Sequence, residues 1–476
     1  DPWLHTISQV EEWNEAFGDG PVVMRRVDNL VDRIWEDQPA PPMQPVKAHP
    51  LEFAGEATTD KCARLAKSLR EARQDALVIT QPDSVMWLLN IRGSDVERNP
   101  LAHCFAVLHA DASVDLYIAP EKLADLGDHL AETVRVRPME DFAEGLAELR
   151  GRIRVDKSTA PQAVADILGE CLVAGSDPCA LAKAKKNAAE IAGSAEAHLR
   201  DGAAMVELLA WLDAQAPGSL TETSVVKQLE TCRRRDNALQ DISFDTISGT
   251  GPNGAVMHYR VTEETDTRLE YGHLLVLDSG GQYLDGTTDI TRTIAIGAPG
   301  EDESAAFTRV LQGMIAMSRL VWPKGLAGRD IEAVGRVPLW LAGQDFNHGL
   351  GHGVGAYLSV HEGPQRLRKV SHVPLEPGMI LSNEPGYYRE GAFGIRIENL
   401  LVVQEASVPG GDPEREFLNW QTLTFVPVDR RLIRAHMLSP AERDWLNAYH
   451  AEVAAKIGPR VGPEAKQWLE AATAPL

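Results

Sequence analysis

The sequence predicts a mixed α/β (α+β) protein that is divided into two or three domains. Strand-like apolar runs alternate with helical patterns from residue 51 to residue 180, which is typical of a compact α/β domain. A long helical pattern over about 183–214 opens a second unit, and glycine-punctuated strands follow residue 241. A chain of 476 residues can bury the large core that this division requires.

The first of these units contains short elements in regular alternation. They are, in order, a helix that contains Leu65 and Leu69, a strand at 76–80, a helix at 85–89, strands at 104–108 and 114–118, and a helix at 121–129. Residues 1–50 show no clean period and end in a proline-rich stretch at 39–45, which is typical of a linker. We therefore expect no independent domain before residue 51.

The second unit contains further helical patterns near 302–320 and 328–342. Near the end of the chain, Ser439-Pro440-Ala441-Glu442 has the form of a helix start, because serine caps the helix, proline suits its first turn and glutamate reaches back to the cap. The packing face of that helix is predicted to comprise Trp445, Leu446 and Tyr449.

Composition excludes several classes of partner. The chain has 69 acidic and 47 basic residues, and the resulting net charge of −22 argues against nucleic acid or an anionic membrane as a partner. Five cysteines without a CxxC pair suggest buried, reduced thiols in a cytoplasmic protein. No apolar run approaches the ~18 residues of a membrane span, and no signal peptide is visible. The chain starts at Asp1, so we expect that an upstream part has been removed or omitted.

Two aspartates follow or precede apolar strands. Asp278 ends the run 274–277, which predicts a buried strand, although an aspartate there could simply cap the following turn. Asp289 lies eleven positions later, and a hairpin would bring the two carboxylates together. Taken alone, Asp289 reads as an exposed strand residue that pairs with Arg292 or a lysine. Strand alternation places Thr287, Thr291 and Thr293 on the same face as Asp289, and their hydroxyls could support a metal site.

Three further polar residues lie in glycine-rich or apolar surroundings. His352 belongs to the segment 348–355, in which alternating glycines disfavour a helix and favour an extended segment or loop. Glu384 follows a strand-like run at 379–381. Glu398 shares a strand face with Arg396, and a surface ion pair is the simplest interpretation of these two residues alone. A lone histidine is usually structural, and we interpret the histidines outside these motifs in that way.

Together, Asp278, Asp289, His352, Glu384 and Glu398 are typical of a site for two metal ions. Buried carboxylates either take up a proton or acquire a cation, and four negative charges match two divalent ions. Hydroxide held between two such ions is a hydrolytic nucleophile at neutral pH. The sequence therefore predicts a metallohydrolase.

The surrounding motifs resemble the aminopeptidase P family. They are, in order, 244–251 with His258, Asp278, Asp289-Ile290-Thr291-Arg292-Thr293, 348–355, His361-Glu362-Gly363-Pro364, Glu384-Pro385-Gly386 and Arg396-Ile397-Glu398-Asn399. The fourteen positions from Glu384 to Glu398 also match, and the resemblance extends to 90–95 in the preceding domain. It is greatest to the larger, cytosolic, three-domain type.

This resemblance implies a pita-bread catalytic domain preceded by a creatinase-like α/β domain. The implied division is a tail of a missing N-terminal domain plus linker at 1–50, a middle domain at 51–180, a catalytic domain at 181–415 and a C-terminal extension packed on it at 416–476. It also implies two Mn²⁺ per subunit, with Co²⁺, Fe²⁺ or Zn²⁺ as possible substitutes, because oxygen ligands and one imidazole suit these ions. A homodimer is implied as well.

Roles for single residues follow from the same resemblance. Asp278 would bind one metal and His352 the other, Asp289 and Glu398 would bridge them, and Glu384 would bind metal and accept the proton of the bridging water. Substrate and tetrahedral intermediate would be handled by His258, His348, His361 and Arg396, while Phe244 would pack against the substrate proline. The implied activity is release of the first residue from peptides that begin Xaa-Pro, since proline fits ordinary peptide pockets poorly.

Three alternatives remain open at this stage. A prolidase would share the fold and the metals but act only on Xaa-Pro dipeptides. A metal-free binding protein could borrow the fold, although the five intact ligand positions count against it. A creatinase-like enzyme would share the architecture and use no metal.

Overall fold

The computed structural model describes residues 1–476, which divide into two compact units, Asp1–Lys183 and Ala184–Leu476. No helix combines the length and the apolar character that crossing a membrane would require. The five cysteines are free thiols, and all except Cys171 are buried.

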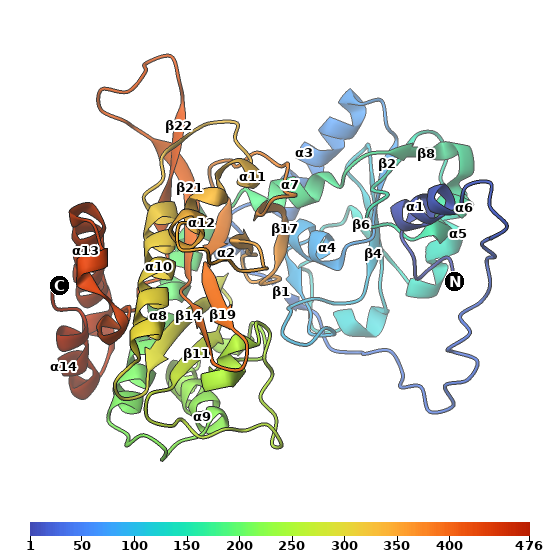
Figure 1. Ribbon diagram of the computed structural model, residues 1–476. Helices are drawn as coiled ribbons and strands as arrows, with labels where there is room; N and C mark the ends of the chain where they lie inside the picture. Colours follow the sequence, from blue (N-terminus) through green and yellow to red (C-terminus); the bar gives the residue numbers. More distant parts are fainter. The chain divides into compact units, whose positions relative to one another are not determined.

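The first unit is built around a six-stranded sheet in the order β6-β5-β4-β2-β7-β8 (Figure 1). Strand β4 pairs antiparallel with β2 and β5, while β5–β6, β2–β7 and β7–β8 are parallel pairs. The strands are β2 (Ala76–Ile79), β4 (Phe105–His109), β5 (Val114–Tyr117), β6 (Val134–Arg137), β7 (Ile153–Val155) and β8 (Leu172–Ala174), with a separate pair β1 (Lys47–Ala48) and β3 (Ile91–Arg92). The helices are α1 (Ile7–Phe17), α2 (Leu51–Ala54), α3 (Thr58–Glu71), α4 (Pro82–Leu88), α5 (Phe142–Glu148), α6 (Gln162–Leu168) and α7 (Pro178–Ala184).

Most elements predicted for this unit are confirmed, with two differences. The predicted helix at 121–129 is wrong: only a 3₁₀ turn, Pro120–Leu123, forms there. Lys122 is drawn into a buried ion pair with Asp95, and Gly127 adopts a positive φ that ends any helical path. Helix α1 lies in the region without a clean period, and Ile7 at its start is buried in the core of the unit.

The second unit contains two groups of strands with helices packed against them. The first group comprises the sheet β10-β11-β14 and the smaller sheet β13-β12-β9; the second is a six-stranded sheet in the order β15-β22-β21-β18-β16-β17, with a hairpin β19-β20 beside it. The strands of the first group are β9 (Leu239–Ile242), β10 (Ile247–Thr250), β11 (Leu274–Ser279), β12 (Gly281–Tyr283), β13 (Gly286–Thr287) and β14 (Ile290–Ala295). Those of the second are β15 (Trp322–Pro323), β16 (Gly351–Gly353), β17 (Glu362–Leu367), β18 (Ile380–Asn383), β19 (Gly386–Arg389), β20 (Phe393–Arg396), β21 (Asn399–Ala406) and β22 (Phe417–Thr422).

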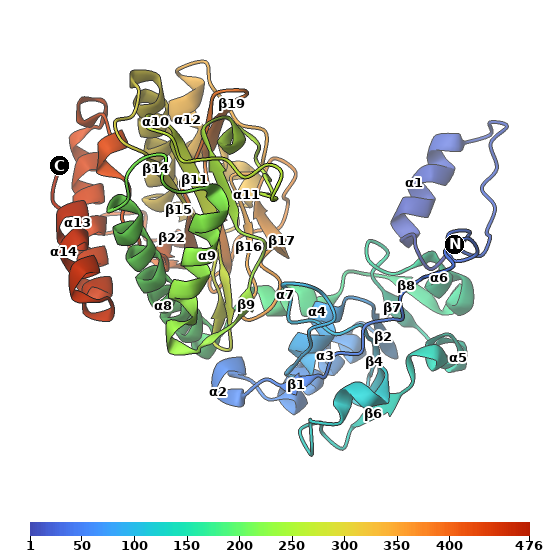
Figure 2. The same ribbon diagram turned by 90° about the horizontal axis from the view of Figure 1, so that it is seen from below.

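Helices α8 and α9 lie side by side against the sheet β10-β11-β14 (Figure 2). Their apolar residues meet Leu275 and Leu277 of β11 and Ile290 and Ile294 of β14. Because strand side chains alternate, the intervening residues of these strands point to the opposite face of the sheet. The helices of the unit are α8 (Ala188–Asp213), α9 (Glu222–Arg233), α10 (Glu301–Ser318), α11 (Gly328–Ile331), α12 (Ala333–Trp340), α13 (Pro440–Ile457) and α14 (Pro463–Ala472).

The C-terminal helices α13 and α14 pack against α8 and α10 (Figure 1). The predicted capping box is present, since the Ser439 hydroxyl accepts from the Glu442 backbone N–H and the Glu442 side chain accepts from the Ser439 backbone. Leu446 and Tyr449 are buried, and Trp445 packs against the same core. The predicted packing face of this helix is thereby confirmed.

Candidate metal centre

The two aspartates lie at either end of the segment that joins β11 to β14. Asp278 is the last but one residue of β11 and stands opposite Thr291 of β14, while Asp289 directly precedes β14. Their exposed fractions are only 8% and 3%. Asp289 is therefore not an exposed strand residue, and Arg292 points to the opposite face, where it donates to the carbonyls of Pro427 and Val426.

The other three candidate ligands come from the second group of strands. His352 is the middle residue of β16, Glu384 follows β18, and Glu398 lies between β20 and β21. The Glu384 backbone N–H donates to Leu350, and that of Glu398 donates to Thr291. The second of these bonds joins the two groups of strands at the point where the five side chains meet.

The structure brings the five side chains together. Ligand atoms lie within 4.8 Å of one another in each of three sets: Asp278, Asp289 and Glu398; His352, Glu384 and Glu398; Asp289, His352 and His361. His352 Nε2 is 3.4 Å from Asp289 Oδ2 and 3.6 Å from Glu384 Oε1. Residues that are far apart in the sequence thus form one compact donor set.

The electrostatics of this donor set favour cation binding. Burial, followed by the charges of Asp278 and Glu384, raises the pKa of Asp289. Burial also raises the pKa of Glu398, with the charges of Asp289 and Glu384 adding to it, and burial raises the pKa of Glu384. Asp278 Oδ1 and Glu398 Oε1 are buried without a hydrogen-bond partner. Crowded carboxylates with unpaired oxygens fit divalent cations, so the residues present fit a dinuclear metal site.

Neighbouring hydroxyl and carbonyl groups orient these ligands. The Thr291 hydroxyl donates to Glu398 Oε2 over 2.8 Å, and Ser382 donates to Glu384 Oε1 over 3.1 Å. His352 Nδ1 donates to the Gly353 carbonyl, which leaves Nε2 as the atom that faces the carboxylates. Of the threonines that alternation places on this face, Thr287 contacts Gln282 and Thr293 contacts the Arg396 carbonyl instead.

Arg396 is buried against the cluster and does not form a surface pair with Glu398. Its Nη2 donates to Asp278 Oδ2 over 2.6 Å, and its Nη1 donates to the Tyr388 hydroxyl over 2.7 Å. Tyr388 in turn lies 2.9 Å from His348 Nε2. The sequence interpretation missed Tyr388, although its position in a strand-like run after Glu384-Pro385-Gly386 is the signal that could have found it.

The predicted substrate residues differ in how close they lie to the carboxylates. The ring of His361 is 4.3 Å from that of His352, and burial followed by the His352 charge lowers the pKa of His361 to about 4. Burial and the Arg396 charge lower the pKa of His348 to about 3. Phe244, between β9 and β10, and the exposed His258 make no hydrogen bond or ion pair with the five candidate ligands. The charge of His258 nevertheless contributes to lowering the pKa of both other histidines.

Models of known families match three consecutive parts of the chain. Residues 37–190 match the creatinase/prolidase N-terminal domain, residues 192–405 match metallopeptidase family M24, and residues 416–476 match the C-terminal region of peptidase M24.

Curated relatives and solved structures agree with these matches. Aminopeptidase P2 of Arabidopsis thaliana is 38% identical over 519 residues, which cover 100% of this chain and 73% of the relative. A probable Xaa-Pro aminopeptidase P of Laccaria bicolor is 39% identical over 465 residues, which cover 94% of this chain and 72% of the relative. Among solved structures, the chain superposes on X-prolyl aminopeptidase from Caenorhabditis elegans with a TM-score of 0.93 at 33% identity, covering 100% of this chain and 80% of that one. That relative is described as a cytosolic enzyme with a di-nuclear active site.

The Xaa-Pro dipeptidase from Bacillus anthracis shares the fold, with a TM-score of 0.62 at 23% identity over 78% of this chain and 99% of that one. The resemblance that the motifs indicate is confirmed, and so is the pita-bread domain preceded by a creatinase-type domain. The chain belongs to the aminopeptidase P family of M24 metallopeptidases.

Proposed function

We propose that this chain is a dinuclear metallo-aminopeptidase that releases the first residue from peptides with proline in the second position. The observation that carries this function is the convergence of four carboxylates and one imidazole in a chain whose relatives are aminopeptidases P. The curated relatives at 38% and 39% identity carry the name aminopeptidase P, which favours the aminopeptidase over the prolidase alternative.

We propose manganese as the native metal, two ions per subunit. The ligands would be Asp278, Asp289, His352, Glu384 and Glu398, with Asp289 and Glu398 shared between the ions. Hard carboxylate oxygens with a single imidazole support manganese, while Co²⁺, Fe²⁺ and Zn²⁺ are possible substitutes. When bound, such ions lower the pKa of water and polarise the scissile carbonyl.

The chain's own residues would then move protons and hold the substrate. We assign Glu384 to accept the proton of the attacking water, as the family resemblance implies. Its Oε1 accepts from the Ser382 hydroxyl and lies 3.6 Å from His352 Nε2. His361 has a ring nitrogen within 4.8 Å of ligand atoms of Asp289 and His352, and it is assigned to donate to the developing oxyanion.

The remaining substrate residues make different contacts around the carboxylates. His348, whose two nitrogens already contact Gly349 and Tyr388, would have to exchange one contact in order to reach substrate. Arg396 holds Asp278 and Tyr388 in place. We assign His258 to substrate contact and Phe244 to packing against the proline ring.

The choice of peptide tests the reaction. After metal removal and manganese addition, the protein should cleave an Xaa-Pro-Pro tripeptide and leave proline at the new N-terminus. Turnover restricted to an Xaa-Pro dipeptide would establish the prolidase alternative and overturn the proposal.

Substitution of the proposed base tests the mechanism. Glu384→Gln should lower kcat by roughly 10²–10⁴-fold, because it removes the proton acceptor. Glu416→Gln, at an exposed ion pair with Lys324, should leave kcat unchanged and serves as the control. Full activity of Glu384→Gln, or absence of bound manganese from the reconstituted wild type, would contradict the catalytic assignment.

We further propose a cytoplasmic homodimer. Free buried thiols support a reducing compartment, and the nematode relative is described as cytosolic. The C-terminal helical region is the proposed contributor to the subunit contact. Light scattering of the purified chain should give twice the mass of one chain, and a monomer at micromolar concentration would contradict the dimer.

A further inference from the structure

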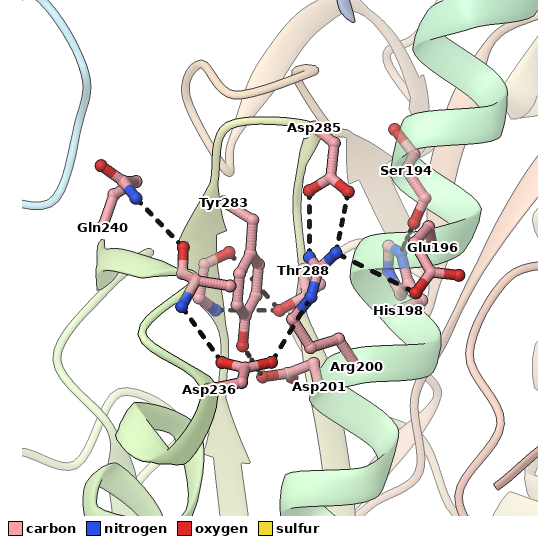
Figure 3. A network of polar contacts seen from close by, with 12 residues as sticks. Ser194, Glu196, His198, Arg200, Asp201, Asp236, Gln240, Tyr283, Asp285 and Thr288 are labelled. Carbon is pink, nitrogen blue, oxygen red and sulfur yellow. Dashed lines mark hydrogen bonds and ion pairs between the residues drawn. The ribbon is translucent and has the colours of Figure 1, made fainter. Parts of the chain in front are cut away.

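A buried polar network lies between α8, α9 and the segment 279–288, and Figure 3 shows Asp201 and Tyr283 from it. This segment joins Asp278 to Asp289, so its shape sets how far apart the two carboxylates stand. None of the residues in the network belongs to the donor set itself.

The centre of the network is an ion pair between Asp201 of α8 and Arg233 at the end of α9. Arg233 Nε donates to Asp201 Oδ1 over 2.7 Å and Nη2 donates to Oδ2 over 3.0 Å. Both residues are 2% exposed. Although burial alone would raise the pKa of Asp201, the charge of Arg233 and hydrogen bonds from Arg233, Tyr283 and Thr288 bring it below its usual value.

The pair is bonded to the connecting segment at Ser279 and at Tyr283. Beside Asp278, the hydroxyl of Ser279 accepts from Arg233 Nη2 over 3.0 Å. Farther along the segment, Thr288 beside Asp289 contributes to lowering the pKa of Asp201. Between them, the Tyr283 hydroxyl donates to Asp201 Oδ1 over 2.8 Å. Strand alternation explains this arrangement, because neighbours of the ligands point to the helix side of the sheet while the ligands point to the metal side.

The segment itself is held tightly in this shape. The Gly281 backbone N–H donates to Thr288 Oγ1, and the Ser243 hydroxyl donates to the Thr288 carbonyl. A Cβ on Gly280 would lie 1.9 Å from the Thr288 carbonyl oxygen, so the two strands approach closely. Farther out, Arg200 of α8 makes a bidentate pair with Asp285 over 3.1 Å (Figure 3).

Stability alone is a weak explanation for this ion pair. Replacing a buried ion pair with neutral residues of similar volume is often neutral or stabilising, because the desolvation of two charges offsets their attraction. Arg233 Nη1 is moreover buried without a hydrogen-bond partner. The directional bonds from the pair to Ser279, beside Asp278, and to Tyr283 point instead to a role in geometry.

We propose that Asp201 and Arg233 are positioning residues for the metal centre, which set the spacing of Asp278 and Asp289 through Ser279 and Tyr283. This inference rests on the proposed dinuclear site. Partners outside the direct ligands typically change metal affinity by about 10–100-fold when removed.

The test measures the Kd for Mn²⁺ of metal-stripped full-length protein, by competition with a chelating dye, together with the thermal midpoint of the metal-free protein. Arg233→Met should weaken manganese binding by about 10–100-fold. Ser279→Ala and Tyr283→Phe each remove one bond and leave the ion pair intact. Each should weaken manganese binding by about tenfold, the lower end of that range. These two variants keep the test decisive even if Arg233→Met folds poorly.

A double substitution separates geometry from stability. In Asp201→Asn/Arg233→Met the buried charges are gone, so the thermal midpoint of the metal-free protein should recover toward the wild-type value. Manganese affinity should stay at least about tenfold weaker, because the bond to Ser279 is still missing. If both the thermal midpoint and the manganese affinity returned to their wild-type values, the ion pair would be merely structural and the inference would be overturned.

A matched control is the buried ion pair of Lys122 with Asp95 in the first unit, which holds no candidate ligand. Lys122→Met should lower the thermal midpoint without changing the Kd for Mn²⁺. Wild-type affinity in Ser279→Ala, Tyr283→Phe and the double variant would overturn the inference while leaving the proposed function intact. A wild-type protein that binds no Mn²⁺ would overturn both.

Discussion

His450 on α13 is a buried base whose protonation is unfavourable in the folded protein. Its side chain has no exposed surface, and Nε2 accepts from the Val428 backbone N–H over 3.1 Å. Burial, followed by the charges of Arg292 and Arg430, lowers the pKa of His450 from 6.5 to about 4. The unfolded chain therefore binds more protons than the folded chain between these two values.

This difference predicts a loss of stability in acid. The contribution of His450 is fully present above pH 6.5 and is lost as the pH falls toward 4. Between pH 7 and pH 5 the wild type should lose about 2 kcal/mol more unfolding free energy than His450→Gln, in which the side chain stays neutral. Urea unfolding of the two metal-free proteins at both pH values measures this, and equal losses would contradict the prediction.

The elements around the metal centre show which structural features a sequence can predict. The alternation in β14 is local, so it predicts correctly that Thr291 and Thr293 share a face, and the Ser439 capping box is equally local. Partners from distant elements are not encoded in any short pattern. Tyr388 beside His348, and Arg233 beside Ser279, depend on which helices and strands become neighbours. The proposed set of five ligands came from whole motifs that resemble a known family, and the structure brings these side chains together.

Helix α9 anchors the segment that carries His258. Glu222, the first residue of the helix, has no exposed surface and accepts from the Thr250 backbone N–H over 2.7 Å. It also accepts from the Asn253 amide over 3.0 Å, the Tyr259 hydroxyl over 2.9 Å and the Thr267 backbone N–H over 3.2 Å. One carboxylate thus organises the backbone on both sides of His258.

Removal of this anchor should affect substrate handling more than metal binding. Glu222→Ala leaves several buried donors unpaired, so it should cost about 2–3 kcal/mol of unfolding free energy. It should lower kcat/KM while the Kd for Mn²⁺ stays at the wild-type value, because the candidate ligands lie on other elements. Glu230→Ala, which removes a pair between this helix and Arg234 just beyond its end, is the control and should change stability by less than about 1 kcal/mol. A wild-type kcat/KM in Glu222→Ala would contradict the anchoring role.

At the scale of the whole molecule, the candidate metal ligands are confined to one of the two units. All five candidate ligands belong to the second unit, where the bond from Glu398 to Thr291 joins its two groups of strands. We propose that the C-terminal extension, 416–476, folds as part of this unit, because Leu446 and Tyr449 share a core with α10. The first unit, in which we place a tail at 1–50 and a middle domain at 51–180, has its own core around Val78 and Val107.

Metal binding should therefore stabilise one unit selectively. A ligand that binds only the folded state adds about 2.7 kcal/mol at a concentration of 100 Kd for each site. Hydrogen exchange with and without Mn²⁺ should show increased protection in β11, β14, β16 and β18 and unchanged protection in the sheet of the first unit. Asp289→Ala, which removes a proposed bridging ligand, should abolish the increase. An equal gain of protection in β2 and β4 of the first unit would contradict the assignment, since neither strand carries a candidate ligand.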